Sequence, residues 1–152
     1  VCTSSGSGIW GNFGQSNYVA AKTAMVGFMN VLALEGASHN IRINCLAPGA
    51  ATRMTATVPG RPPIDVDDPP PERAPSLVTP AVLYMCSEDA PTGKIFQAMG
   101  GRFSQAAMYT NPGVALGTEA SFETFCDNLS TINDMSAAED GVAKRARQRS
   151  RG

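Results

Sequence analysis

The sequence lacks the features that mark membrane-spanning, exported and nucleic-acid-binding proteins. No apolar run approaches the roughly 20 residues that a membrane-spanning helix needs. No signal peptide opens the chain, and a formal net charge of −1 gives no general attraction to nucleic acid or to an acidic membrane. We therefore expect a cytoplasmic protein that binds neither nucleic acid nor membrane.

Patterns typical of metal sites and disulfide frameworks are also missing. The cysteines are widely spaced, without any Cys-x-x-Cys pair: Cys2, Cys45, Cys86 and Cys126. We expect them to be reduced thiols that pack as small apolar residues. The one histidine, His39, has no cluster of further ligands beside it in the sequence. We therefore predict no metal site.

The chain is short for an enzyme that binds a dinucleotide. Its 152 residues suffice for one domain, whereas a dinucleotide-binding domain uses two mononucleotide-binding halves. The composition, 43% hydrophobic and 16% charged, is typical of a globular protein. The first five residues are typical of the end of a strand rather than of the start of a domain.

Ser5, Tyr18 and Lys22 have a spacing that suits proton transfer to and from an alcohol or a carbonyl. The sequence after Tyr18 has helical character, so Tyr18 and Lys22 lie at i and i+4 and project from one face of a helix. A free tyrosine has a pKa of about 10, too high for ready proton exchange at neutral pH, and a nearby ammonium favours the phenolate. Ser5, thirteen residues before Tyr18, could hydrogen-bond the same substrate oxygen from a neighbouring loop.

These three residues, followed by Asn44 and Pro48-Gly49, resemble the short-chain dehydrogenase/reductase family. Residues 11–18, 33–36 and 47–55 are similar to one branch above all, the (3R)-hydroxyacyl-CoA dehydrogenases of multifunctional β-oxidation enzymes and their bacterial relatives. The resemblance implies an α/β fold, namely the C-terminal part of a doubly wound parallel-sheet Rossmann-type domain. It also implies that the first half, with its glycine-rich pyrophosphate loop, is missing, so we interpret the chain as a fragment.

The same resemblance implies a reaction and a role for each site residue. The cofactor would be NAD, or alternatively NADP, and the substrate a secondary alcohol or ketone such as a 3-hydroxyacyl-CoA. Tyr18 would be the general acid/base, Ser5 would stabilise the developing oxyanion, and Lys22 would favour the Tyr18 phenolate and hold the nicotinamide ribose. Cofactor contacts would come from Tyr18, Lys22, Pro48, Gly49, Ala51 and Thr52. Thr52 lies one position closer to the proline than in most members of the family.

A glycine-rich stretch after Ser5 matches the dinucleotide fingerprint Gly-x-Gly-x-x-Gly but lacks its context. Residues 6–11 should follow a strand and open a helix, with an acidic residue about 20 positions later at the end of a second strand. The next predicted helix begins only near residue 16, and the candidate acid, Glu35, lies inside that helix. We therefore predict a flexible loop that lets Ser5 approach the substrate.

Residues 16–39 are predicted to form one long helix, with Ser16 as its N-cap and Asn40 as a left-handed C-cap. Apolar residues cover nearly its whole circumference, which predicts burial on every side. The resemblance implies that one face packs on the sheet and the other on a partner subunit of a homo-oligomer. A single crowded core within one monomer is the alternative.

A strand, helix and strand follow this long helix. Residues 42–47 are a predicted strand that ends at Pro48, where α/β sheets bind their ligands. Thr79 and Pro80 are the predicted N-cap and first residue of a second helix, and residues 94–99 are a second strand. This order predicts parallel α/β winding, with residues 1–101 as the partial catalytic half.

Three further segments lie outside this pattern. Residues 57–75 are rich in proline and cannot hold a regular helix, so they form an extended lid, a disordered linker or a stretch altered by a reading error. Residues 102–143 are a predicted C-terminal extension with one amphipathic helix capped by Thr118. Its apolar stripe, a core or subunit contact, comprises Phe122, Phe125, Leu129 and Ile132. Residues 144–152 are basic and are predicted to be a disordered tail.

A second class of function is also consistent with the sequence. A chain without the first half of its domain would leave a sheet edge and apolar surface exposed. The alternative is therefore a non-catalytic remnant, or a dimerisation fragment without activity of its own. Specific binding of NADH to the 152-residue chain would separate the two hypotheses.

Overall fold

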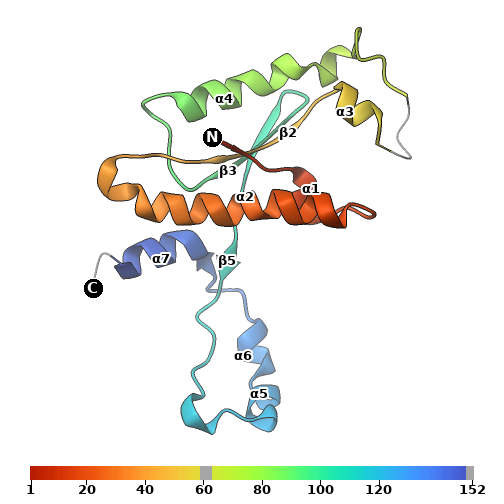
Figure 1. Ribbon diagram of the computed structural model, residues 1–152. Helices are drawn as coiled ribbons and strands as arrows, with labels where there is room; N and C mark the ends of the chain where they lie inside the picture. The colour runs from red at the N-terminus through yellow and green to blue at the C-terminus, as the bar shows by residue number, and fades with distance from the viewer. Residues whose placement is uncertain (59–62, 150–152) are drawn as a thin grey trace. The chain divides into compact units, whose positions relative to one another are not determined.

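The computed structural model describes residues 1–58 and 63–149, which belong to two compact units (Figure 1). Unit 1 comprises Val1–Ala106 and unit 2 begins at Ala107. The predicted end of the first unit at residue 101 is too early, because the strand Arg102–Ala106 (β4) pairs with the sheet of unit 1. The two units are described separately below.

Unit 1 is built on a four-stranded sheet in the order β1-β2-β3-β4. The other strands are β1 (Cys2–Thr3), β2 (Cys45–Gly49) and β3 (Ile95–Met99). β1, β2 and β3 are parallel, which confirms the predicted α/β class. β4 is antiparallel to β3, and we did not predict this strand. The turn that reverses the chain uses Gly100 and Gly101 at φ values of 57° and 73°, which favour glycine.

Helices cover both faces of this sheet. The helices of unit 1 are α1 (Gly6–Trp10), α2 (Ser16–Glu35), α3 (Arg53–Ala56) and α4 (Thr79–Cys86), of which α2 and α4 pack on the sheet. Cys45 packs in a buried cluster with residues of α2, whereas its neighbour Leu46 packs with residues of α4. Since successive strand residues point to opposite faces, α2 and α4 lie on opposite sides of the sheet (Figure 1).

α2 ends earlier than the predicted helix over residues 16–39. It begins at Ser16, so Gln15 rather than Ser16 is the N-cap, and it ends at Glu35. The chain turns at Gly36, whose carbonyl accepts a hydrogen bond from the amide of Ile41 at 3.0 Å. A Cβ atom at Gly36 would lie 2.9 Å from the Cβ of Ile41, so only glycine allows this close return. Ala37–His39 form a 3-10 turn, and Asn40 has the predicted left-handed conformation, with φ 53°.

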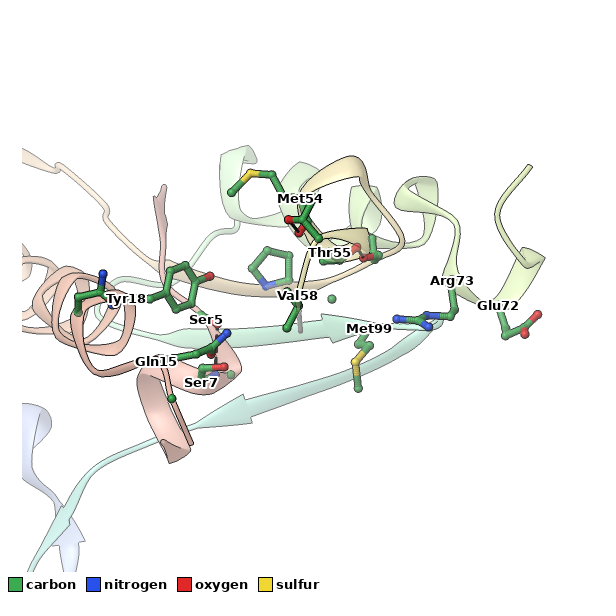
Figure 2. Close-up of a pocket in the computed structure, with 17 residues that line it drawn as sticks. Ser5, Ser7, Gln15, Tyr18, Met54, Thr55, Val58, Glu72, Arg73 and Met99 are labelled. Carbon is green, nitrogen blue, oxygen red and sulfur yellow. Dashed lines mark hydrogen bonds between the residues drawn. The ribbon is translucent and has the colours of Figure 1, made fainter. Parts of the chain in front are cut away.

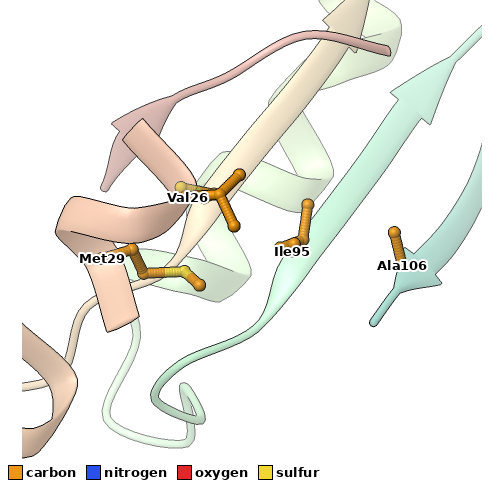
Figure 3. Packing of buried hydrophobic residues seen from close by; sticks show 5 residues of the cluster. Val26, Met29, Ile95 and Ala106 are labelled. Atoms are coloured by element: carbon orange, nitrogen blue, oxygen red, sulfur yellow. The ribbon is translucent and has the colours of Figure 1, made fainter. Parts of the chain in front are cut away.

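Only one face of α2 is buried. Val26 and Met29 pack with Cys45, Ile95 and Ala106 in one apolar cluster (Figure 3). On the opposite face, Phe28 and Val31 are each 51% exposed. No second layer of the described residues covers that face, so the alternative of a single crowded core within one monomer is wrong. Burial of this face against a partner subunit stays a prediction.

β2 extends further than the predicted strand over residues 42–47, since Pro48 and Gly49 continue its pairing with β3. Proline lacks an N–H group and is tolerated only where a strand has no neighbour to accept a hydrogen bond. The carbonyl of Leu46 accepts from the amide of Ser4, so Leu46 points toward β1. Pro48, two residues later, has the same orientation but lies beyond the end of β1 at Thr3. Its missing N–H group therefore leaves no ladder hydrogen bond unmade.

The predicted second helix and second strand are present with small shifts. α4 begins at Thr79, so Val78 is the N-cap and Pro80 occupies the second helical position. β3 begins at Ile95, one residue after the predicted start. Within the proline-rich segment, Pro71–Arg73 and Pro75–Val78 form 3-10 turns. The predicted lid or linker over residues 57–75 also includes residues 59–62, which lie outside the described residues.

Unit 2 contains short elements rather than one amphipathic helix. They are β5 (Tyr109–Thr110), a 3-10 turn (Gly117–Glu119), α5 (Phe122–Asp127), α6 (Leu129–Asn133), β6 (Glu139–Asp140) and α7 (Gly141–Arg149). The helix cap is Ser121 and not Thr118, because Ser121 and Thr124 form a reciprocal capping box. Phe122 of the predicted stripe is 77% exposed.

The basic segment forms a helix through Arg149 instead of the predicted disordered tail, whose last three residues lie outside the described residues. The side chain of Asp140 accepts hydrogen bonds from the amides of Val142 and Ala143, at 2.9 and 3.1 Å, and so caps the first turn of α7. Glu139 forms ion pairs with Lys144 and Arg147. These contacts offset part of the like-charge repulsion that predicted disorder.

Candidate active site

Ser5 lies between β1 and α1, just beyond the carboxyl end of β1. Its backbone is extended, with φ −161° and ψ 151°, and its side chain caps α1 by accepting a hydrogen bond from the amide of Ser7 at 3.2 Å. The preceding residue, Ser4, is only 1% exposed and donates to the carbonyl of Lys22 at 2.9 Å. Ser5 is therefore held against α2 by its neighbour while its own hydroxyl faces outward.

Tyr18 and Lys22 lie one turn apart on α2, as their spacing predicts. The Tyr18 side chain is 39% exposed, and the Nζ atom of Lys22 lies 5.8 Å from the centroid of the Tyr18 ring. Lys22 Nζ also donates to the carbonyl of Thr3 at the end of β1, at 3.1 Å. The ammonium is thus anchored beside the phenol, with donor capacity left for another group.

Gly8 sets the distance between α1 and α2. A Cβ atom at Gly8 would lie 2.8 Å from the Cβ of Lys22, so the two helices meet at a point where only glycine fits. The hydroxyl of Thr23 on α2 donates a hydrogen bond to the carbonyl of Gly8 at 2.6 Å, which stabilises the contact between α1 and α2. The stretch that matches a dinucleotide fingerprint is therefore a short packed helix. The predicted flexible loop, and the prediction that the next helix begins only near residue 16, are therefore wrong.

Trp10, the last residue of α1, joins this helix to the sheet. Its indole N–H donates to the side chain of Gln97 on β3 at 3.0 Å. The amide nitrogen of Gln97 in turn donates to the hydroxyl of Ser104 on β4 at 3.1 Å. The helix capped by Ser5 is therefore bonded to α2 through Gly8 and to two strands through Trp10.

A pocket of about 550 Å³ opens at the carboxyl ends of β2 and β3. It is lined by Ser5, Gly6, Ser7, Gly14, Gln15, Asn17, Tyr18, Pro48, Gly49, Ala50, Met54, Thr55, Thr57, Val58, Glu72, Arg73 and Met99. Figure 2 shows the Tyr18 ring projecting from α2 into this space, with Ser5 on the neighbouring wall. Ser5, Tyr18, Pro48 and Gly49, four of the predicted site residues, thus share one cavity.

The remaining predicted cofactor residues do not line this cavity. Ala51 is 2% exposed, and its amide donates to the carbonyl of Arg73 at 2.8 Å. Thr52 caps α3 through its hydroxyl and exchanges hydrogen bonds with Thr55. Thr55 lines the pocket instead, one helical turn further on. Lys22 is also not part of the pocket wall.

Sequence reasoning missed several residues of the pocket wall, among them Thr55, Arg73 and Met99. Met99 packs so closely on Gly49 that a Cβ atom there would lie 2.7 Å from the Met99 sulfur. The sequence carried a usable signal for Met99, because it ends a predicted strand next to the ligand-binding edge of the sheet. It carried no such signal for Arg73, which comes from the irregular proline-rich segment.

The described residues fit one half of a nicotinamide dinucleotide. The ammonium of Lys22 and the phenol of Tyr18 offer hydrogen bonds to a ribose diol, and residues 48–50 line the pocket beside them. The pyrophosphate half needs a glycine-rich turn between a strand and a helix. Within residues 1–58 and 63–149, the one stretch with that pattern is the packed helix α1.

Two further observations limit the chemistry of the described residues. They contain no group of three or more His, Cys, Asp or Glu side chains placed to hold a metal ion. None of their helices is long and apolar enough to cross a membrane.

The pKa of the Cys45 thiol is raised from 9.0 to about 11, first by burial and second by the neighbouring Cys2. Cys45 therefore stays protonated at neutral pH.

Comparisons with known proteins agree with this arrangement. Residues 1–61 match the model of a family described as short chain dehydrogenase. A short-chain type dehydrogenase/reductase of Mycobacterium tuberculosis is 40% identical over 140 residues, which are 91% of this chain and 47% of that protein. The acetoacetyl-CoA reductase of an Acinetobacter strain is 37% identical over 109 residues, which are 68% of this chain and 44% of that protein.

The fold is also similar to solved structures. Full-length peroxisomal multifunctional enzyme type 2 from Drosophila melanogaster superimposes with a TM-score of 0.71 at 31% identity, over 98% of this chain and 27% of that one. The chain therefore spans about half the length of the Mycobacterium tuberculosis relative and about a quarter of the Drosophila enzyme.

Proposed function

Residues 1–61 belong to the short-chain dehydrogenase family, and from this we propose that the chain carries the proton-transfer residues of a nicotinamide-dependent oxidoreductase. The proposed reaction interconverts a secondary alcohol and a ketone. The observation that supports it most is the shared pocket of Ser5, Tyr18 and Pro48-Gly49, with the ammonium of Lys22 beside the Tyr18 ring. Family membership alone supports only the broad class of oxidoreductase.

In the proposed mechanism Tyr18 removes the hydroxyl proton of the alcohol during oxidation and returns it during reduction. Ser5 donates a hydrogen bond to the same oxygen as its negative charge develops. The ammonium of Lys22 stabilises the negative charge on the Tyr18 oxygen during this exchange. A bound nicotinamide supplies the hydride acceptor or donor for the carbon atom.

We propose NAD as the cofactor, with NADP as the alternative. Lys22 and Tyr18 would hold the nicotinamide ribose, and the chain from Pro48 to Thr52 would hold the carboxamide. Of that loop, Pro48 and Gly49 line the pocket, while Ala51 and Thr52 would act through the position of the backbone. Thr55 is a better placed hydroxyl than Thr52, because it is part of the pocket wall.

We propose a 3-hydroxyacyl-CoA as the substrate. One relative is named acetoacetyl-CoA reductase, and that name specifies a thioester with a ketone at the third carbon. The pocket provides polar groups for such an oxygen at Ser5 and Tyr18. It also provides apolar side chains, Met54, Val58 and Met99, for an acyl chain.

A second proposal concerns assembly. The face of α2 opposite the sheet carries small and apolar residues, and Phe28 and Val31 on it are each half exposed. Covering such a face with the same face of a second copy would remove apolar surface from water. We therefore propose a homo-oligomer through α2, and a chain that only dimerises is the alternative function. The cytoplasm is the proposed location.

The test of the proposed function is turnover by the gene product that carries this chain, with 3-hydroxybutyryl-CoA and NAD or NADP. We expect Tyr18→Phe to lower kcat by roughly 100- to 10,000-fold, the range for loss of a general acid/base. Tyr109→Phe, which removes the hydroxyl of an exposed tyrosine outside the pocket wall, is the matched control. Unchanged turnover in Tyr18→Phe would show that the assigned role is wrong.

Titration of the 152-residue chain with NADH distinguishes the two classes of function. Specific binding supports a cofactor half-site in this chain. No binding, together with concentration-dependent dimers that Phe28→Ala weakens, favours a dimerisation role.

A further inference from the structure

Arg73 is a cationic side chain in the pocket wall, at the end of the 3-10 turn Pro71–Arg73. Its carbonyl accepts the amide of Ala51 at 2.8 Å, so its backbone is fixed to the loop that follows β2. Figure 2 shows its guanidinium on the side of Met99, whereas the carboxylate of Glu72 points the other way. The backbone anchor therefore directs a positive charge into the cavity.

The guanidinium has no partner among residues 1–58 and 63–149. No hydrogen bond or ion pair joins it to Glu72 or to any other described side chain. Two other arginines have partners within the chain, since Arg42 donates to the carbonyl of Glu88 and Arg147 pairs with Glu139. Because a guanidinium has five N–H donors in a planar fork that suits carboxylates and phosphates, Arg73 is available for an anion from outside the chain.

The pocket has a polar reacting end and a cationic end with apolar side chains between them. In Figure 2, Tyr18 and Ser5 lie at one end and Arg73 at the other, with Val58 and Met99 between. A ligand that fills this space would place its reacting oxygen at Tyr18, an apolar stretch along the middle, and an anionic group at Arg73.

We propose that Arg73 determines specificity by binding an anionic group of the substrate, at a distance from the reacting carbon. This rests on the proposed function, in which Tyr18 receives the alcohol oxygen. The anion is a phosphate of the thioester carrier or a carboxylate at the far end of the acyl chain, and both offer paired oxygens to the fork of Arg73. Binding there sets the affinity for the substrate and leaves the proton transfer at Tyr18 unchanged.

The experiment compares three substrates that share the reacting group. They are 3-hydroxybutyryl-CoA, its uncharged N-acetylcysteamine thioester, and the N-acetylcysteamine thioester of 3-hydroxyadipate, which carries a terminal carboxylate. We expect Arg73→Ala to raise KM for one of the two anionic substrates by roughly tenfold to a hundredfold, as for loss of a charge-assisted hydrogen bond. The value of kcat and all constants for the uncharged thioester should stay within about twofold, and Arg73→Lys should restore part of the loss because it keeps the charge.

The outcomes separate the sources of the anion and the failure of each proposal. A rise confined to the CoA thioester assigns the site to phosphate, and a rise confined to the adipate derivative assigns it to carboxylate. Equal changes for all three substrates, or none, overturn the anion site. Arg53→Ala, an exposed arginine outside the pocket wall, is the matched control.

If the wild-type protein turns over none of the three substrates, the proposed function fails. Calorimetry then tests separately whether Arg73 binds an anion. The probes are then coenzyme A and adipate, titrated into the wild-type protein and Arg73→Ala. Binding of either probe that is lost in Arg73→Ala supports the anion site. Equal binding, or no binding by the wild type, overturns it.

Discussion

Unit 1 and unit 2 are stabilised in different ways. Unit 1 buries apolar side chains in two clusters, on either face of its sheet. In unit 2, no apolar side chain among residues 107–149 is fully buried, and hydrogen bonds hold its segments together. Asn111, for example, donates to the carbonyls of Ile132 and Asp134, both at 2.8 Å. The difference teaches that the candidate site depends on packed apolar side chains, whereas unit 2 depends on hydrogen bonds, both in helix caps and between distant segments.

The largest change in unfolding free energy is expected from a substitution in the buried cluster of unit 1. Met29 is 1% exposed, so Met29→Ala leaves a cavity and should destabilise the chain by about 2–5 kcal/mol. Urea unfolding measures this free energy. Met54→Ala, at a site that is 78% exposed, is the control and should change it by less than about 0.5 kcal/mol. Similar losses for both variants would contradict the assignment of the core.

A smaller effect is expected where α1 meets α2. In Gly8→Ala the new methyl group would lie 2.8 Å from the Cβ of Lys22, and the helices must separate. We expect a loss of about 1–3 kcal/mol in unfolding free energy, as for other overpacked sites. Gly6→Ala in the same helix meets no atom within 4 Å and should not destabilise the chain. Equal behaviour of the two variants would rule out the close contact.

The buried thiol of unit 1 predicts a loss of stability at alkaline pH. The folded state raises the pKa of Cys45 from 9.0 to about 11, so the unfolded state ionises first. The contribution of the protonated Cys45 thiol to the unfolding free energy is fully present below pH 9. It is lost as the pH rises toward 11, and the loss is about 1 kcal/mol at pH 10. Unfolding free energies at several pH values measure it. Cys45→Ala should remove this part of the slope, and an unchanged slope would show that Cys45 is not its source.

The smallest effect is expected in unit 2. Phe122 is 77% exposed, so Phe122→Ala should change the unfolding free energy by less than about 0.5 kcal/mol. Ser121→Ala removes the neighbouring cap and should cost about 1 kcal/mol, more than the loss of the large aromatic ring. The reverse order would mean that Phe122 is covered by packing, and the contrast between the units would disappear.

Much of unit 1 could be predicted from the sequence because its signals are local. The i and i+4 spacing placed Tyr18 and Lys22 on one helix face, and the strand before Pro48 placed the pocket at the correct edge of the sheet. The end of α2 could not be predicted, since it depends on the return of Ile41 onto Gly36. Arg73 was missed for the same reason. Its place in the pocket depends on a backbone hydrogen bond to Ala51, which no local pattern reveals.

The chain contains a single tryptophan, and its indole is the group that bonds α1 to Gln97. Fluorescence from this side chain therefore originates at one known point, the C-terminal end of α1. A shift of its emission on adding a ligand would report release or tightening of that attachment. The molecule thus contains its own optical probe of the helix that follows Ser5, without any added label.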